Sequence, residues 1–113
     1  MNTKIAHNYY VYFTTNPGRT TLYIGVTNNL PKRLREHFEQ CGSSKTFAGK
    51  YYCYNLIYYE WFQDVNAAIA REKQLKGWSR DKKNALIGKI NPGWDFATEP
   101  FFDDKWGRFC GNL

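Results

Sequence analysis

Apolar and polar positions alternate in two short stretches near the start of the chain. Residues 8 to 14 read NYYVYFT and residues 20 to 26 read TTLYIGV, and both are rich in aromatic and β-branched side chains. The sequence TNPGR, with its strong turn signal Pro17-Gly18, separates them. Two such stretches joined by a Pro-Gly turn predict a β-hairpin.

The side chains of this predicted hairpin alternate between two faces. Tyr12 and Tyr23 are equidistant from the Pro-Gly centre, so we expect them to lie opposite each other, within a shift of one or two residues. Such an aromatic pair commonly stabilises a hairpin. Gly25 shares a face with Tyr23, and a glycine inside a strand often marks the close approach of a ligand or another backbone. We therefore expect space for a substrate beside the phenol.

A helix is predicted directly after the hairpin. Asn28 or Asn29 can cap its start, and Pro31 is favoured in a first turn. Gly42 is expected to stop this helix. Its apolar stripe consists of Leu30, Leu34 and Phe38.

A third strand and two further helices complete the pattern. Residues 52 to 62, YCYNLIYYEWF, predict a buried strand. Asp64 can cap the helix VNAAIAREKQLKGW, and Ser79 can cap the helix RDKKNALIGKI, which ends at Asn91-Pro92. The order β-β-α-β-α-α predicts an α+β domain, with a small three-stranded, mainly antiparallel sheet flanked by about three helices.

The composition agrees with a single small soluble domain. The chain has 113 residues, of which 42% are apolar, and a formal charge of +6 that suits a polyanionic partner without requiring one. Three widely spaced cysteines suit a reducing cytoplasm, and the lack of a long apolar run predicts no membrane partner. We expect residues 1–96 to form the domain, and the acidic, aromatic residues 97–113 to pack on it or to be partly mobile.

Glu72 lies on the apolar stripe of the second predicted helix. The other members of the stripe are Val65, Ala68, Ile69, Leu75 and Trp78. A carboxylate that faces a core is costly unless it is paired or bound to a metal. The pattern alone favours a residue at the edge of the stripe that pairs with Lys76, or with Arg71 or Lys73.

Arg33 and His37 are four positions apart and project from one face of the first helix. Arginine binds phosphate groups bidentately, and histidine titrates near neutral pH. A solvated helix face is nevertheless the more common explanation, because Lys32, Arg35 and Glu36 are close in sequence.

A basic stretch runs from residue 71 to residue 89, where seven Lys and Arg residues stand against Glu72 and Asp81. The basic residues are Arg71, Lys73, Lys76, Arg80, Lys82, Lys83 and Lys89. With Trp78 among them, they could follow a nucleic-acid backbone, although a basic solvated helix is about as common.

The order of these features is more specific than any one of them. Tyr10-Val11-Tyr12, then Tyr23-Ile24-Gly25, then Arg33, His37, Glu72 and Asn91 resemble the GIY-YIG nuclease superfamily, and more closely its small stand-alone bacterial subgroup. The segments YYVY, TLYIGVTNNLPKRLREH, YYE and AIAREKQLKGW followed by NP are each similar to signatures of that subgroup. The resemblance covers about residues 8 to 96.

The resemblance implies a role for each matching residue. Tyr12 matches the tyrosine that ends the first motif, and Tyr23 matches the one that acts as general base on the attacking water. Arg33 matches the arginine that steadies the pentacovalent phosphate. His37 matches a histidine with a positioning or proton-relay role.

The remaining matches concern the metal and the end of the domain. Glu72 matches the single carboxylate that ligates Mg²⁺ or Mn²⁺, and Asn91 matches an asparagine late in the domain. Tyr10 replaces the first glycine of the first motif. Val26 stands where some repair nucleases have a lysine near the metal, which implies a less basic site.

The resemblance implies a divalent-metal-dependent DNA endonuclease that is structure-selective rather than sequence-specific. Its targets would be nicked, flapped or branched DNA, or would be supplied by a protein partner. The alternatives are a nucleic-acid-binding module of the same fold with weak or no cleavage, and a protein-interaction domain that uses the aromatic tail. The residues expected to contact nucleic acid are Arg33, Arg71, Lys73, Lys76, Arg80, Lys82 and Lys83.

Overall fold

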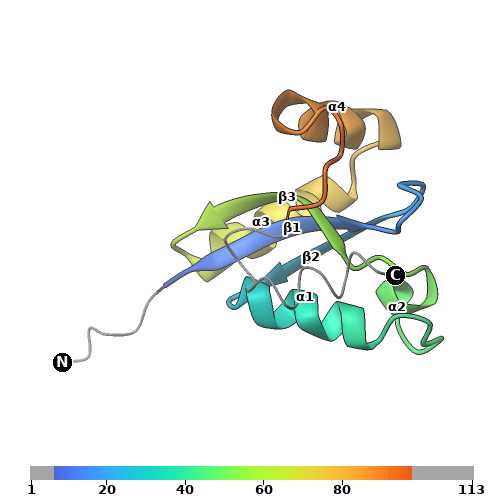
Figure 1. Ribbon diagram of the computed structural model, residues 1–113. Coiled ribbons are helices and arrows are strands. Elements are labelled where there is room, and N and C mark those ends of the chain that lie inside the picture. Colours follow the sequence, from blue (N-terminus) through green and yellow to red (C-terminus); the bar gives the residue numbers. More distant parts are fainter. Residues whose placement is uncertain (1–6, 98–113) are drawn as a thin grey trace.

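The computed structural model describes residues 7–97 (Figure 1). The expected α+β class is confirmed, with one short additional helix. The elements are β1 (Tyr9–Thr15), β2 (Leu22–Thr27), α1 (Leu30–Glu39), α2 (Phe47–Lys50), β3 (Asn55–Phe62), α3 (Val65–Lys76) and α4 (Arg80–Ile90). None of the helices among these described residues is long and apolar enough to cross a membrane.

The three strands form an antiparallel sheet in the order β2-β1-β3, so β1 is central. In the observed register Tyr12 lies opposite Gly25, and Tyr23 lies opposite Thr14. The register is therefore shifted by two residues from a direct pairing of Tyr12 with Tyr23, at the limit of the expected range. The cause is the loop, where the Asn16 side chain accepts hydrogen bonds from the backbone N–H groups of Thr20 and Thr21.

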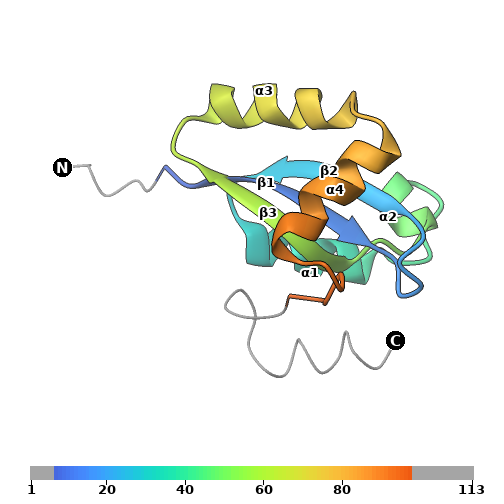
Figure 2. The ribbon, with the colours of Figure 1, turned by 90° about the horizontal axis from the view of Figure 1, so that it is seen from above.

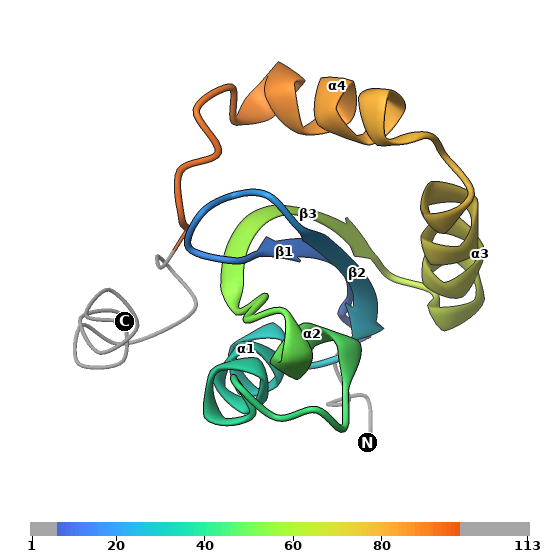
Figure 3. The same cartoon turned by 90° about the vertical axis from the view of Figure 1, so that its right-hand side faces the viewer.

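Helices cover both faces of the sheet (Figure 3). One core lies under α3 and α4 and is built from the β1 residues Val11 and Phe13 together with Ala68, Leu75 and Ile87. The other lies under α1 and contains Tyr12, Leu30, Leu34 and Leu56. Figure 2 shows α3 running alongside β2, while α4 lies over the strands.

The predicted helix starts are confirmed. The side chains of Asn29, Asp64 and Ser79 each accept a hydrogen bond from a backbone N–H in the first turn of α1, α3 and α4. The apolar stripe of α3 is narrower than expected. Val65 and Ile69 are 38% and 36% exposed, because the helix meets the sheet mainly through the buried Ala68 and Leu75.

The short helix α2 was not predicted. Its Thr46 cap accepts a hydrogen bond from Gly49 N–H, and four residues are too few to produce a periodic pattern. Gly49 is required because a Cβ there would lie 2.5 Å from the Gln40 carbonyl oxygen. The preceding helix ends at Glu39, before Gly42, and β3 begins at Asn55 rather than at residue 52.

The predicted acidic, aromatic tail lies outside the described residues, except for its first residue. Ala97 N–H donates a hydrogen bond to the Leu56 carbonyl at 2.8 Å, which attaches the start of this segment to β3. The predicted division of the chain at residue 96 stays a prediction.

Candidate active site

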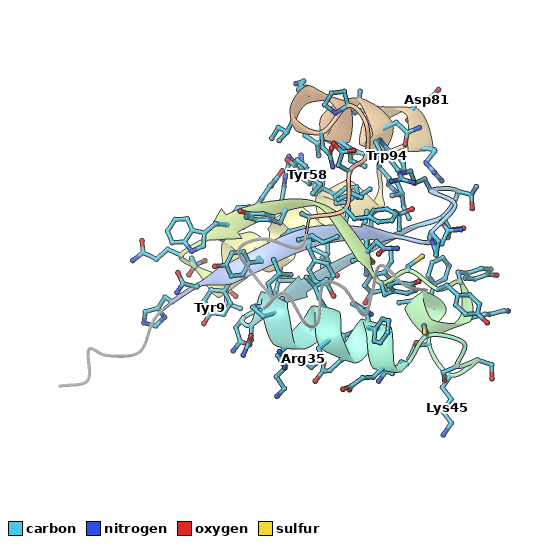
Figure 4. All side chains as sticks on the ribbon, in the orientation of Figure 1. Tyr9, Arg35, Lys45, Tyr58, Asp81 and Trp94 are labelled. Atoms are coloured by element: carbon cyan, nitrogen blue, oxygen red, sulfur yellow. The ribbon has the colours of Figure 1, made fainter. Side chains whose placement is uncertain are left out.

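Tyr12, Arg33 and His37 meet between the sheet and α1. The Tyr12 hydroxyl lies 2.8 Å from His37 Nε2, and Arg33 Nε–H donates to the Tyr12 oxygen at 3.3 Å. Arg33 also forms an ion pair with Glu36 at 3.2 Å. The helical spacing of Arg33 and His37 turns both side chains toward the sheet, so the solvated-face explanation does not describe them. By contrast, Arg35 points away from the sheet (Figure 4).

The environment fixes the charges of these three groups. Burial, together with Tyr23, raises the pKa of Tyr12 above its usual range by more than Arg33 lowers it. Burial, assisted by the nearby Arg33, lowers the pKa of His37 to about 4. Burial by itself would lower the pKa of Arg33, but Tyr12 and its other partners raise it. At neutral pH the site holds a protonated phenol, a neutral imidazole and a charged guanidinium.

The tautomer of His37 sets the direction of its hydrogen bond with Tyr12. A neutral imidazole with its proton on Nδ1 accepts the phenol proton at Nε2, whereas the other tautomer donates to the phenol oxygen. The Tyr12 oxygen accepts from Arg33 in either case. Nδ1 is buried without a hydrogen-bond partner in the described part of the chain.

Gly25 does not leave space for a substrate, and that expectation is wrong. A Cβ at Gly25 would lie 2.5 Å from the Tyr12 hydroxyl oxygen and 2.9 Å from the Tyr23 ring. The absent side chain is thus replaced by the Tyr12 phenol itself. The glycine still serves the site, because it allows the phenol to reach His37 and Arg33.

Tyr23 lies at the open side of this cluster. Its ring meets the His37 ring edge-on at 4.9 Å and lies 6.1 Å from the Tyr12 ring. Tyr23 also lines a pocket of about 280 Å³ on edge strand β2. The other lining residues are Leu22, Ile24, Phe47, Lys76 and Lys83. A group bound in this pocket would contact Tyr23.

Glu72 is linked to the same pocket by its ion pair with Lys76. Lys76 Nζ forms an ion pair with Glu72 Oε2 at 3.0 Å, as the helical spacing predicted, and Lys76 lines the pocket. The Glu72 side chain is 15% exposed, so it lies at the edge of the apolar stripe rather than in the core.

The residues present are compatible with a hard cation. No group of three or more His, Cys, Asp or Glu side chains that could hold a metal occurs within residues 7–97. Mg²⁺ is commonly held by only one or two carboxylates, with water and substrate phosphates as the other ligands. Glu72, a carboxylate paired with a mostly exposed lysine, fits this arrangement.

One residue that was expected to contact nucleic acid, Arg71, has structural partners. Arg71 donates to both Glu60 oxygens at 2.9 Å and lies over the Trp78 ring. Tyr58, which lies on the face of the sheet toward α4 (Figure 4), donates to Glu60 at 2.5 Å. These hydrogen bonds lower the pKa of Glu60, although burial opposes them. The Arg71 guanidinium is thus held in a bidentate ion pair with Glu60.

Asn91 does not line the pocket that contains Tyr23. Its side-chain amide donates to the carbonyls of Ile57 and Asp95 at 2.9 Å, and its oxygen accepts from Asp95 N–H at 2.9 Å. It lines a separate pocket of about 480 Å³ between β3 and the end of α4. This geometry clamps the chain after α4 onto the sheet, and a catalytic role for Asn91 stays a prediction.

Phe47 is the site residue that the sequence analysis missed. It belongs to α2, and its ring stacks on Tyr23 with a centroid separation of 6.3 Å. The sequence Ser-Lys-Thr, which can cap a helix, directly precedes Phe47, and this was the signal from which a short helix with an aromatic residue could have been predicted. Lys83 was expected to contact nucleic acid, but not to share a pocket with Tyr23.

Comparison with known proteins assigns this chain to a family. The model of the GIY-YIG catalytic domain matches residues 8–85. The chain belongs to the GIY-YIG catalytic domain family, and the recognition made from the sequence is confirmed. Membership supports a nuclease with a nucleic-acid substrate.

Several small proteins are similar to this chain. The UPF0213 protein CPE1444 of Clostridium perfringens is 39% identical over 67 residues, covering 59% of this chain and 70% of that protein. A UPF0213 protein of Bacillus pumilus is 36% identical over 84 residues, covering 74% and 83%. The solution NMR structure of the UPF0213 protein BH0048 from Bacillus halodurans covers 85% of this chain and 99% of that one, with 22% identity and a TM-score of 0.49.

Proposed function

We propose that this protein is a divalent-metal-dependent endonuclease that hydrolyses phosphodiester bonds in DNA. The observation that carries the proposal is the convergence of Tyr12, Arg33, His37 and Tyr23 in a chain of the GIY-YIG family. Hydrolysis of a phosphodiester needs a positioned cation, a proton acceptor for the attacking water and stabilisation of the leaving oxygen.

Arg33 is suited to bind the reacting phosphate. Its side chain is 34% exposed and is anchored through Nε to Tyr12 and through Nη1 to Glu36. A guanidinium held in this way can direct its charge at the nonbridging oxygens as negative charge develops on them. The raised pKa of Arg33 keeps this charge at any working pH.

Tyr23 is the proposed base, and the other two groups position it. It lines the pocket, whereas Tyr12 is fully buried and its raised pKa keeps the phenol protonated. The neutral His37 contacts the Tyr23 ring and fixes its orientation. In its phenolate form, Tyr23 would accept the proton of a water that attacks phosphorus. The bond between phosphorus and the leaving 3′-oxygen then breaks, and that oxygen takes a proton from solvent.

Glu72 would hold the metal, either Mg²⁺ or Mn²⁺. When bound, such an ion stabilises negative charge on the leaving oxygen. The ion would compete with Lys76 for the Glu72 carboxylate, so Lys76 must turn away and become available to the DNA backbone.

The target is proposed to be a DNA structure rather than a sequence. Two lysines, Lys76 and Lys83, and the Phe47 ring line the pocket together with Tyr23. Such groups contact phosphates and the faces of bases, whereas sequence is read from the edges of bases. A protein partner could add further target choice.

The second candidate is a binding module that cuts slowly or not at all. It is favoured by the Glu72–Lys76 ion pair, which occupies the proposed metal ligand. The two candidates bind the same nucleic acid and differ only in cleavage, so one experiment separates them.

That experiment is a nicking assay on supercoiled plasmid and on labelled nicked, flapped and branched DNA, with Mg²⁺ or Mn²⁺. The native chain is compared with Glu72→Gln and with Glu39→Gln, which removes an exposed carboxylate at the end of α1. We expect Glu72→Gln to bind but not cut, and Glu39→Gln to cut normally. Cleavage by Glu72→Gln at the native rate would overturn the metal assignment. Binding without cleavage by the native chain would establish the binding module.

A further inference from the structure

A continuous row of aromatic rings leads from the buried site to the surface. Tyr12 is fully buried at one end, and His37 and Tyr23 follow, in contact with each other. Tyr23 stacks on Phe47 with an angle of 29° between the rings, and Phe47 lies 4.7 Å from Tyr51. The last two rings belong to α2 and to the residue that follows it.

The outer part of this row is open to solvent. Phe47 is 51% exposed and Tyr51 is 42% exposed. Phe47 also forms a wall of the pocket that contains Tyr23. Large aromatic side chains held at the surface beside a pocket offer a flat apolar face to a planar ligand.

Positive charges lie next to this surface. Lys76 and Lys83 line the pocket on the side of α3 and α4, and Lys50 Nζ lies 5.4 Å from the centre of the Tyr51 ring. A ligand that fits both features has a planar ring next to a negatively charged backbone. The pocket, at about 280 Å³, is near the lower end of the range of roughly 300–1,000 Å³ for small-ligand sites.

We propose that Phe47 and Tyr51 form a stacking platform for an unpaired DNA base beside the phosphodiester that is cut. The inference rests on the proposed nuclease function and names its substrate class, which is DNA with an unpaired segment at the cleavage point. In a duplex, each base face is covered by its neighbours. Only an unpaired base can present its face to Phe47 while its phosphate reaches Arg33 and Tyr23.

The platform has a matched control on the same molecule. Trp61 on β3 is 53% exposed, comparable to Phe47, but it donates to Asn8 and does not line the Tyr23 pocket. Removing either ring takes away a similar exposed apolar surface. Only Phe47→Ala removes the ring that stacks on Tyr23.

The test uses flapped DNA with 2-aminopurine at the first unpaired position, and a duplex of the same sequence without a flap. Binding is measured in EDTA, so that cleavage plays no part. We expect the native chain to quench 2-aminopurine, and Phe47→Ala to bind flapped DNA about tenfold more weakly with unchanged affinity for the duplex. Phe47→Trp should bind as the native chain does, and Trp61→Ala should have no effect.

The proposal is overturned if Phe47→Ala and Trp61→Ala bind flapped DNA equally well, or if the native chain shows neither binding nor quenching. Phe47→Leu keeps the apolar volume without the aromatic face, and it should lose quenching even if Phe47→Ala fails to fold. Cleavage is scored separately. Native cleavage without stacking contradicts only the platform, whereas stacking without cleavage contradicts only the nuclease.

Discussion

The Tyr12 hydroxyl oxygen lies 2.8 Å from Nε2 of His37, although the two residues are 25 positions apart in the chain. This hydrogen bond joins the central strand β1 to α1. Leu30 and Leu34 of the same helix pack on the Tyr12 face of the sheet. The geometry of the candidate site is therefore fixed by one of the two cores of the domain.

His37 predicts a loss of stability in mild acid. Its pKa is about 4 in the folded chain, against an ordinary value of 6.5, so the unfolded state binds more protons between these pH values. The contribution of His37 is complete above pH 6.5 and is lost as the pH falls toward 4. It amounts to at most roughly 3 kcal/mol of the unfolding free energy. Urea unfolding across this pH range measures it.

The control for this prediction is a comparison of two histidines. His37→Gln should flatten the pH dependence in that range, whereas His7→Gln, which changes an exposed residue, should leave it as in the native chain. Equal slopes for all three proteins would contradict the assigned state of His37.

Gly25 predicts a steric conflict. Gly25→Ala places a Cβ against the buried Tyr12 phenol and should destabilise the fold by about 1–3 kcal/mol. Gly88→Ala is the matched control, since nothing lies within 4 Å of a Cβ there and the residue is inside α4. That change should stabilise the protein by up to about 1 kcal/mol. The unfolding temperatures of both variants, compared with that of the native chain, test this prediction.

The contacts of Arg33 predict that lysine cannot replace arginine at this position in cleavage. Arg33→Lys keeps a positive charge but loses the planar group that contacts Tyr12 and Glu36. We expect single-turnover cleavage to fall by about 100-fold or more, with binding of DNA much less affected. Arg35→Lys, on the outer face of α1, should cut at the native rate. Cleavage by Arg33→Lys at that rate would show that charge alone suffices.

The basic residues should divide into structural and DNA-contacting groups. Arg71→Ala leaves the half-buried Glu60 without its bidentate partner, and should destabilise the fold by about 1–3 kcal/mol with little change in DNA affinity. Lys83→Ala should weaken DNA binding. It should also lower the slope of the logarithm of the binding constant against the logarithm of the salt concentration by about one, since one phosphate contact is lost. Binding titrations at several salt concentrations, together with urea unfolding, distinguish the two. An unchanged salt slope for Lys83→Ala would remove it from the interface.

Asn91 predicts a loss of stability. Asn91→Ala removes three hydrogen bonds that join the end of α4 to β3 and to Asp95, which should cost about 1–3 kcal/mol. If the residue only clamps the fold, cleavage well below the unfolding temperature should stay near the native rate. A large fall in rate in a stably folded variant would instead support the catalytic role implied by the family resemblance.

The sequence predicted those parts of the fold that depend on local signals. The capping residues Asn29, Asp64 and Ser79 and the alternation of the strands are local, and each was found where it was expected. The hairpin register was predicted only to within two residues, because the Asn16 side chain organises a loop whose centre is later than the Pro-Gly pair.

The parts of the site that were missed depend on contacts between distant segments. The role of Gly25 could not be read from its strand, because the phenol that fills its place comes from the neighbouring strand. The commitment of Arg71 to Glu60 depends on α3 packing beside β3. The helix spacing, by contrast, did predict the Glu72–Lys76 pair, since both partners are on one helix.

In the strand order β2-β1-β3, the two tyrosines of the candidate site lie on strands with different support: Tyr12 is on the central strand and Tyr23 is on an edge strand. Tyr12 belongs to the strand that is paired on both sides, so its amide should exchange hydrogen only on global unfolding. Tyr23 belongs to an edge strand, so its amide should exchange more readily than that of Tyr12. The half that anchors the site is thus held on both sides, whereas the half that we propose to contact DNA lies on a strand that is paired on one side only.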